Sequence, residues 1–266
     1  MAENSRQPKR DLELMVDAAR EAGEIALHYF RGDNRVWTKS GNSPVSQADI
    51  EVNEYLFGNL LAARPDYGWL SEESEHNDER LDREFVFVVD PIDGTRGFIA
   101  GEKQWAICVA VVADGRPVAG VIHCPALDRT FSAAAGEGAW LNGEPIVTPA
   151  SATILKITGC KRLNADLAEH FGDAMDIAPF IPSLACRVVM VANGELDGAF
   201  ARSGAHDWDL AAADLVLSES GGAIVDLSGR PLSYNRAKLG FPPLVAAGPG
   251  RREGLLALAK DGGFLQ

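Results

Sequence analysis

The sequence predicts a mixed fold in which an α+β half is followed by an α/β half. Between residues 105 and 135, short apolar runs alternate with turn signals such as Asp114-Gly115, which is typical of an antiparallel meander. After residue 150, strand-like and helix-like segments alternate, which is typical of an α/β arrangement. The composition changes near residues 149–153, so we expect one domain over 1–150 and a second over 151–266.

Two helices and several strands are expected in the first half. Apolar residues recur at three- and four-residue steps over 11–30 and over 48–63, which predicts two helices that each pack one face on a neighbour. Residues 85–89 read FVFVV, a continuous apolar run that predicts a buried strand. The other strands of this half are expected at 68–70, 105–112, 117–124 and 130–135.

The second half is expected to alternate strands with helices to its end. Asn193-Gly194 and Gly221-Gly222 each follow an apolar segment and terminate the helix predicted there. The helices are expected at 164–171, 183–192 and 210–220, and the strands at 154–159, 174–178, 199–201 and 223–227, before a final strand and helix.

The chain is acidic, which limits the partners we expect. Its 266 residues are 46% hydrophobic and carry a net charge of −13, so the surface repels nucleic acid and anionic membranes. We therefore expect no nucleic-acid or membrane partner. A phosphorylated substrate would be repelled as well, unless bound cations reverse the local field.

The cysteines and the N-terminus indicate in which cellular compartment the protein is expected. Cys108, Cys124, Cys160 and Cys186 are widely spaced, so we expect reduced, buried thiols instead of a disulfide or metal–thiolate framework. The N-terminus is polar and no apolar run is long enough to span a bilayer. We therefore expect a cytoplasmic protein.

Two aspartates follow the buried strand at 85–89 within the stretch DPIDGT. Asp90 and Asp93 are separated by two residues, and Thr95 is expected to cap a helix that starts there. Carboxylates beside a helix N-terminus can form a hard-cation site next to an anion site. The alternative is that both aspartates are ordinary turn residues and Thr95 is a simple N-cap.

Two further acids lie at the ends of predicted elements. Glu72 follows the strand at 68–70, and Asp209 lies in the first turn of the helix that continues through 210–220. Each has a structural alternative, a solvated corner for Glu72 and an acid that offsets the helix dipole for Asp209. If the four acids meet, an oxygen-only ligand set points to Mg²⁺, with Mn²⁺ or Ca²⁺ as alternatives.

The chain resembles the inositol monophosphatase superfamily of Mg²⁺-dependent, Li⁺-sensitive phosphatases. The resemblance lies in SEES at 71–74, DPIDGT at 90–95 and WDLAAADLVLSESGG at 208–222. A weaker match is KSGNSPVSQAD at Lys39–Asp49, where Ser46 replaces the family's threonine. The resemblance implies a layered α/β/α/β/α sandwich with an N-terminal antiparallel sheet and a C-terminal mixed sheet.

The resemblance also implies the site. Glu72, Asp90, the carbonyl of Ile92, Asp93 and Asp209 are expected to hold two or three Mg²⁺ ions. Mn²⁺ is an alternative, and Li⁺ and Ca²⁺ are expected to inhibit. The first domain would thus carry most of the metal site, and the second would complete it with Asp209.

The remaining roles concern water and substrate. Thr95, with Glu72, is expected to position and deprotonate the attacking water, and Asp49 to accept a hydrogen bond from Thr95. The backbone N–H groups of Gly94 and Thr95 are expected to bind phosphate oxygens. Asp93 and Asp209 are expected to contact the substrate as well. The reaction implied is hydrolysis of a small phosphorylated metabolite by metal-activated water.

The substrate is predicted from two arginines. In inositol-preferring members of the family an acid lies seven residues before the position of Asp209, where this chain has Arg202. Arginine suits a second phosphate, although pairing of Arg202 with a surface acid is an equal alternative. Arg96, directly after Thr95, resembles the charged residue that bisphosphate nucleotidases carry there.

We therefore expect a 3'(2'),5'-bisphosphate nucleotidase that converts 3'-phosphoadenosine 5'-phosphate to AMP. The alternatives are inositol monophosphatase acting on myo-inositol 1-phosphate, then histidinol-phosphate or fructose-1,6-bisphosphate phosphatase. A regulatory protein-binding role and a metal-binding module without chemistry are alternatives of a different class. Homodimers are usual in the family, so we expect one here.

Overall fold

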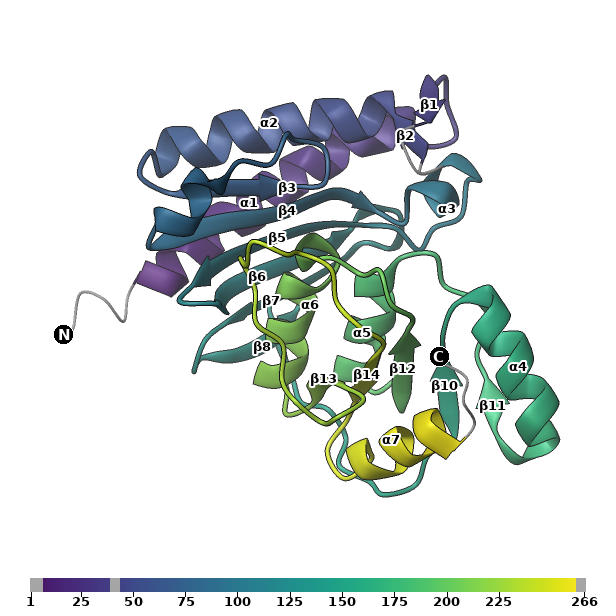
Figure 1. Cartoon of the computed structure of the whole chain (residues 1–266). Coiled ribbons are helices and arrows are strands. Elements are labelled where there is room, and N and C mark those ends of the chain that lie inside the picture. The colour runs from purple at the N-terminus through teal and green to yellow at the C-terminus, as the bar shows by residue number, and fades with distance from the viewer. Residues whose placement is uncertain (1–6, 39–43, 262–266) are drawn as a thin grey trace.

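The computed structural model describes residues 7–38 and 44–261, and these form five alternating layers of helices and strands (Figure 1). Two long helices cover a seven-stranded sheet, two further helices fill the middle, and a five-stranded sheet with two outer helices completes the stack. The layered sandwich expected from the resemblance is thus confirmed. None of the described helices is both long and apolar enough to cross a membrane.

The larger sheet is antiparallel except at one edge. Its strand order is β3-β4-β5-β6-β7-β8-β9, and only the β3–β4 pair is parallel. Asp114 and Gly115 both have positive φ in the turn between β5 and β6, which confirms the predicted hairpin. The strands are β3 Gly68–Ser71, β4 Phe85–Asp93, β5 Ala106–Ala113, β6 Arg116–Cys124, β7 Arg129–Ala134, β8 Gly138–Leu141 and β9 Glu144–Ile146.

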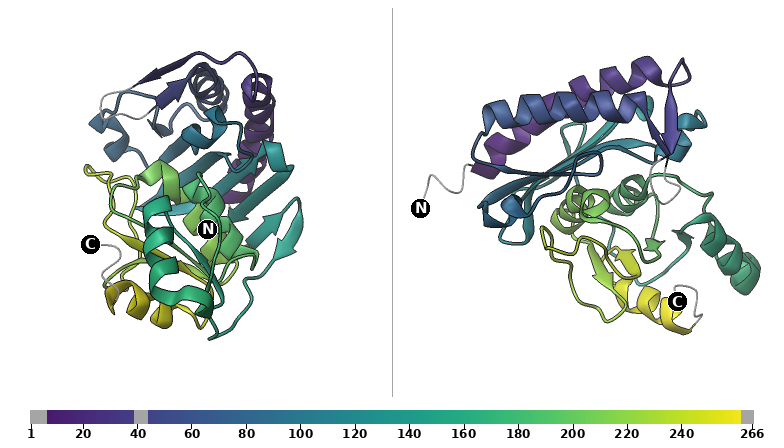
Figure 2. Two further views of the ribbon diagram at one scale, coloured as in Figure 1. Left: turned by 90° about the vertical axis from the view of Figure 1, so that its right-hand side faces the viewer. Right: turned by 45° about the horizontal axis from the view of Figure 1, so that its top comes forward.

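Helices α1 (Gln7–Tyr29) and α2 (Gln47–Ala63) lie side by side across the outer face of this sheet (Figure 2). Alternate residues of β4 face opposite layers, so Val89 packs under α1 and α2 while Val88 packs toward the middle of the molecule. A small hairpin of β1 (Val36–Thr38) and β2 (Pro44–Ser46) leads into α2.

The middle layer consists of α5 (Leu184–Ala192) and α6 (Asp207–Glu219). Both helices are covered by a sheet on each side, which explains why they are apolar around most of their circumference. Because α6 packs on β5 and β6 of the larger sheet, the two halves of the chain share one core. The domain boundary at residue 150 falls between β9 and β10 and stays a prediction.

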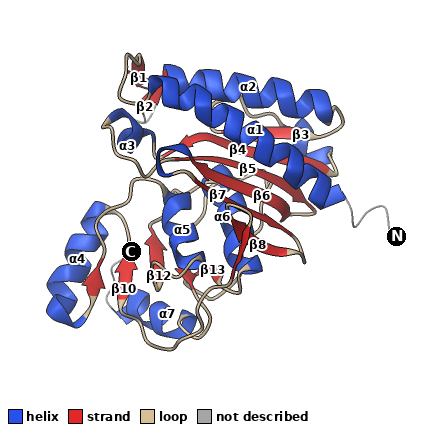
Figure 3. Ribbon diagram, turned by 180° about the vertical axis from the view of Figure 1, so that it is seen from behind, coloured by secondary structure: helices blue, strands red, loops and turns tan. Residues whose placement is uncertain are grey.

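The second sheet is mixed and has the order β11-β10-β12-β14-β13. Helices α4 (Lys161–Phe171) and α7 (Arg252–Asp261) lie on its outer side (Figure 3). Its strands are β10 Lys156–Thr158, β11 Asp176–Ile177, β12 Gly198–Ala201, β13 Ala223–Asp226 and β14 Leu244–Ala247. Short helical turns are α3 Thr95–Ile99, η1 Asp78–Asp82, η2 Pro125–Leu127 and η3 Gly172–Ala174.

The predicted elements differ from the structure mainly at the end of β4. The sequence predicts a strand that ends before Asp90, whereas β4 continues through Pro91 to Asp93. A shift in register lets it do so, because Asp90 lies opposite Cys108 and Asp93 opposite Ala106, which leaves one extra residue on β4. The helix cap also differs, since Gly94 is the N-cap and Thr95 the first helical residue.

Candidate active site

The bulge at the end of β4 shapes the first part of the site. Pro91 has no N–H to give to the ladder, and the next N–H, that of Ile92, donates to Asp90 Oδ1 at 3.0 Å. The backbone therefore bulges between Asp90 and Asp93. Both side chains line one cavity, although they are three residues apart on the same strand. The backbone oxygen of Ile92 lies 3.0 Å from Thr95 Oγ1.

Helix α6 adds the third acid from the other half of the chain. Asp209 lies in its first turn, where its Oδ2 accepts the N–H of His206 at 2.6 Å. One carboxylate oxygen from each of Asp90, Asp93 and Asp209 lies within 4.8 Å of the others. The structure thus brings together three of the acids that the sequence predicts to hold metal.

These three acids are electrostatically unfavourable without a cation. Burial raises the pKa of Asp90 well above its ordinary value, and the charges of Glu72, Asp93 and Asp209 raise it further. Burial and the neighbouring charge of Asp93 do the same to the pKa of Asp209. Oxygen-only donors this close together fit Mg²⁺, which would remove both the repulsion and part of the penalty of burial.

Glu72 lies at the edge of this group. It follows β3, and its N–H donates to the carbonyl of Val89 at 3.2 Å, which ties it to β4. Glu72 lines the same cavity as the three aspartates, but its carboxylate is not within the 4.8 Å group. The predicted fourth acid therefore lines the same cavity but lies apart from the other three.

Thr95 and Asp49 are in contact, as the resemblance implies. Thr95 Oγ1 lies 3.1 Å from Asp49 Oδ1, so the hydroxyl can donate to that carboxylate. Asp49 Oδ2 accepts both the N–H of Ser46 at 2.8 Å and its hydroxyl at 2.6 Å, which fixes the carboxylate at the start of α2. Burial raises the pKa of Asp49 to about 6 in spite of these donors.

Gly94 allows the close contact between the two halves at this point. Its φ is 90°, and a Cβ placed on it would lie 3.0 Å from the backbone nitrogen of Ser183. Only glycine satisfies both conditions. Gly94 and Thr95 line the cavity with their neighbours in α3, and binding of phosphate by their N–H groups stays a prediction.

Ser183 and Arg187 are site residues that the sequence reasoning missed. The hydroxyl of Ser183 donates to Asp93 Oδ2, which also accepts the N–H of Ala185 at 2.6 Å. Ser183 Oγ in turn accepts the N–H of Cys186 at 2.9 Å as the cap of α5. Burial raises the pKa of Asp93, while the hydrogen bonds from Ser183 and Ala185 and the charge of the buried Arg187 guanidinium oppose that rise. A serine before an apolar helix was the available signal, but it does not indicate which acid it binds.

A cavity of about 400 Å³ opens over the acids. It is also lined by the basic residues Arg96 and Lys161, and the Lys161 ammonium lies 5.1 Å from the centre of the Phe180 ring. Lys161 and Phe180 come from the second half of the chain and were not predicted to take part. The cavity thus combines carboxylates with basic and aromatic side chains.

Arg202 does not line this cavity. Its Nη2 lies 3.3 Å from Asp166 Oδ2 on α4, which is the pairing considered as the alternative for this residue. A role for Arg202 in substrate binding stays a prediction. Lys39, the first residue of the weaker sequence match, lies outside the described residues.

The chain matches the inositol monophosphatase family over residues 8–260. It is 32% identical to the 3'(2'),5'-bisphosphate nucleotidase CysQ of Aggregatibacter actinomycetemcomitans, over 85% of this chain and 87% of that protein. It is 31% identical to the inositol-1-monophosphatase of Mesorhizobium japonicum, over 82% and 86% of the two chains.

A crystal structure of the extragenic suppressor protein suhB from Bartonella henselae has the same architecture. The two structures agree with a TM-score of 0.80 at 30% identity, covering 94% of this chain and 98% of the other. The five layers and the order of the elements are therefore shared with a protein of similar length.

Proposed function

The chain belongs to the inositol monophosphatase family and is a phosphoric monoester hydrolase, and from this premise we propose that its acidic cavity binds Mg²⁺ and hydrolyses a small phosphorylated metabolite. The observation that carries the proposal is the group formed by buried Asp90, buried Asp93 and half-buried Asp209, whose carboxylates repel one another in the lining of one cavity. The family is Mg²⁺-dependent in general.

The metal ligands we propose are Glu72, Asp90, the carbonyl of Ile92, Asp93 and Asp209. When bound, Mg²⁺ neutralises phosphate charge and lowers the pKa of water. The chain contributes the geometry, since backbone N–H groups hold three of the carboxylates: that of Ile92 in β4 holds Asp90, that of Ala185 in α5 holds Asp93, and that of His206 at the start of α6 holds Asp209. We expect Mn²⁺ to substitute for Mg²⁺ and Li⁺ and Ca²⁺ to inhibit.

Thr95 and Glu72 are proposed to orient the attacking water. The contact with Asp49 directs the Thr95 hydroxyl proton away from the cavity, which leaves its lone pairs free to accept a hydrogen bond from water. Glu72, at the edge of the acids, would take the proton that the water loses. Neither residue needs to move far, because both already line the cavity.

For the substrate we propose a compound with two phosphates, of which 3'-phosphoadenosine 5'-phosphate is the best candidate. Arg96 and Lys161 line the same cavity as the acids and suit a second anionic group, while the Phe180 ring suits a planar base. The 32% identity to a protein named a bisphosphate nucleotidase supports this choice.

Inositol monophosphate is the second candidate. Arg202 is paired with Asp166 and lies outside the set of cavity residues, which weakens the sequence argument for a second phosphate at that position. The 31% identity to an inositol-1-monophosphatase is almost as high as that to the nucleotidase. A homodimer and a cytoplasmic location stay predictions, and the free cysteines are consistent with a reducing compartment.

Phosphate release from 3'-phosphoadenosine 5'-phosphate and from myo-inositol 1-phosphate, measured side by side with Mg²⁺, tests the substrate. We expect the nucleotide to be preferred, and Lys161→Ala to reduce that preference by about tenfold because one charge-assisted contact is lost. A preference for the inositol phosphate that Lys161→Ala leaves unchanged would overturn the choice. Absence of phosphate release from any phosphomonoester would point to the regulatory role.

A further inference from the structure

The segment between β3 and β4 contains a buried arginine in highly charged surroundings. It begins with Glu72 and runs through the short turn η1, and most of its residues are exposed. Arg80 is the exception, with only 3% of its surface exposed. Burying a guanidinium is unfavourable unless its donors are used, so its contacts indicate why it lies there.

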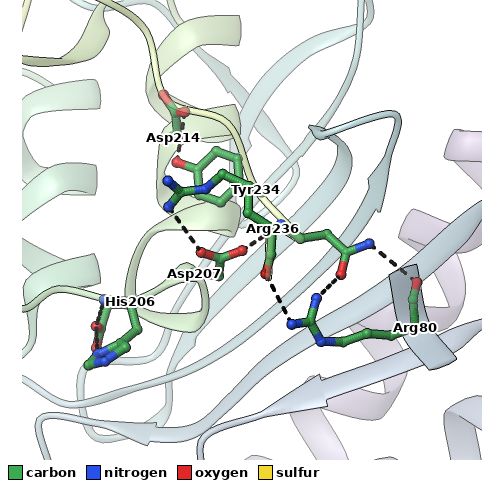
Figure 4. Close-up of polar contacts among 8 residues, drawn as sticks. Arg80, His206, Asp207, Asp214, Tyr234 and Arg236 are labelled. Carbon is green, nitrogen blue, oxygen red and sulfur yellow. Dashed lines mark hydrogen bonds and ion pairs between the residues drawn. The ribbon is translucent and has the colours of Figure 1, made fainter. Parts of the chain in front are cut away.

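Arg80 reaches across to the segment that follows β13 (Figure 4). Its Nη1 donates to Asn235 Oδ1, and its Nη2 donates to the carbonyl of Arg236 at 3.0 Å. The Asn235 side-chain amide donates back to the carbonyl of Arg80 at 3.3 Å. Two segments 155 residues apart in the sequence are thus joined by three hydrogen bonds.

The same segment is bound to the first turn of α6. The N–H of Asn235 donates to Asp207 Oδ2, and Arg236 Nη2 lies 3.9 Å from Asp207 Oδ1 (Figure 4). Asp207 is fully buried and is the first residue of α6, two positions before Asp209. Tyr234 adds a second attachment to this helix, since its hydroxyl donates to Asp214 Oδ2 at 2.8 Å.

A separate contact joins the same two regions. The His76 ring lies 5.1 Å from the ring of Trp208, and His76 Nε2 is 3.0 Å from the carbonyl of Ser71. Ser71 precedes Glu72, and Trp208 precedes Asp209. The segment after Glu72 is therefore attached to the first turn of α6 at two points, one through aromatic packing and one through the Arg80 hydrogen bonds.

We propose that Arg80 is a positioning residue that sets the spacing between Glu72 and Asp209. The inference rests on the proposed function, in which both acids serve one metal site. Asp90 and Asp93 share one strand, whereas Glu72 and Asp209 lie on different elements of the two halves. Arg80, through Asn235 and Asp207, is the hydrogen-bonded one of the two links between the chain after Glu72 and the helix that carries Asp209.

The unsatisfied polar atoms around Arg80 indicate that its hydrogen-bond network serves to position these segments more than to stabilise the fold. Among the described residues, Arg80 Nε, Asp207 Oδ1 and two nitrogens of Arg236 are buried without a hydrogen-bond partner. Such a partly satisfied network contributes less to folding than apolar packing of the same volume. A network of this kind is expected where it holds two elements in one arrangement.

Equilibrium binding of Mg²⁺ to the metal-stripped protein, measured by isothermal titration calorimetry, tests the proposal. We expect Arg80→Ala and Asn235→Ala each to weaken binding by about tenfold, as for residues that orient metal ligands, and Arg80→Lys to recover part of the loss. The double variant should lose less than the product of the two single losses, because both remove the same link.

Arg251→Ala is the matched control. Arg251 lies directly before α7 and is similarly buried. It donates to the carbonyls of Thr153 and Pro149 and forms an ion pair with Asp197, so its removal changes charge and stability in a comparable way. We expect its Mg²⁺ affinity to equal that of the wild type. Equal Mg²⁺ affinities for wild type, Arg80→Lys and Asn235→Ala, with only the melting temperatures lowered, would overturn the proposal.

A failure of the proposed function would give a different result. Asp90→Asn removes a proposed ligand directly, so it should abolish binding whether or not Arg80 has a positioning role. Loss of binding in Asp90→Asn with normal binding in the Arg80 variants rejects only the role of Arg80. Normal binding in Asp90→Asn rejects the metal site itself.

Discussion

Asp11 and the aspartates of the cavity show two ways in which this chain buries acids. Asp11 is fully buried between α1 and α2, where its carboxylate accepts from Arg64 Nε at 2.8 Å, Gln7 Nε2 at 2.9 Å and Tyr67 at 2.9 Å. Asp90, also buried, faces other carboxylates at close range. The first acid is neutralised by the protein, and the second is arranged for a cation from outside.

Burial alone therefore does not identify a functional acid. Asp11 has a cation and neutral donors from its own chain, as expected of a structural carboxylate. Within the described ranges, no lysine or arginine forms an ion pair with Asp90, Asp93 or Asp209. A structural carboxylate faces donors of its own chain, whereas a metal-binding carboxylate faces other carboxylates. The following variants test this difference.

Asp90→Asn should have the largest effect. Removing a proposed ligand charge is expected to lower kcat/KM for phosphate release by about 10³-fold or more. The metal-free protein should stay folded, with a melting temperature equal to or above that of the wild type, because one repulsive charge is removed. Full activity in this variant would contradict the site assignment.

Thr95→Val should separate chemistry from metal binding. It keeps the shape of the side chain but removes the hydroxyl that contacts Asp49, so kcat should fall by about 10²-fold while Mg²⁺ affinity stays unchanged. Thr95→Ser retains the hydroxyl and serves as the control in steady-state assays at saturating Mg²⁺. Full activity in Thr95→Val, or a loss confined to Thr95→Ser, would mean that the hydroxyl is not required.

Asp11→Asn should affect stability alone. It leaves Arg64 without its charged partner and weakens the bonds from Tyr67 and Gln7, so the free energy of unfolding should fall by about 2 kcal/mol. Chemical denaturation measures this loss. The increase in melting temperature produced by Mg²⁺ should equal that of the wild type, and a smaller increase would contradict the separation of the two regions.

Asp214→Asn should have the smallest effect, which is a pH-dependent change in the free energy of unfolding. Burial raises the pKa of Asp214 from 3.8 to about 6, so the stability contributed by its protonated form is present below pH 3.8 and lost as the pH rises through 6. Asparagine still accepts from Tyr234 but does not titrate. At pH 7 the variant should be more stable by about 1 kcal/mol, with a flatter stability profile between pH 4 and 6, both measured by denaturant unfolding.

Local sequence patterns predicted most of the elements and the acids of the site. The run at 85–89 and the helical periodicity at 11–30 and 48–63 depend only on neighbouring residues, so they could be read directly. The resemblance added the contact of Asp49 with Thr95. The bulge that carries β4 past Pro91 was missed, because its register is set by pairing with β5.

Contacts between distant segments could not be predicted. Ser183 binds Asp93 across 90 residues, and Arg80 binds Asn235 across 155, and neither pair has a local signature. The position of Lys161 at the cavity could not be predicted either, because the position of α4 depends on how it packs on the second sheet. The composition of the acidic site was therefore predictable, while the residues that orient it were not.

The acids of the cavity are expected to bind Mg²⁺, whereas Asp11 is expected not to contribute to this binding. Calorimetric titration of Mg²⁺ into metal-stripped wild type, Asp90→Asn and Asp11→Asn tests it most directly. We expect saturable binding in the wild type and in Asp11→Asn, and none in Asp90→Asn. Equal binding in all three proteins, or no binding in the wild type, would contradict it.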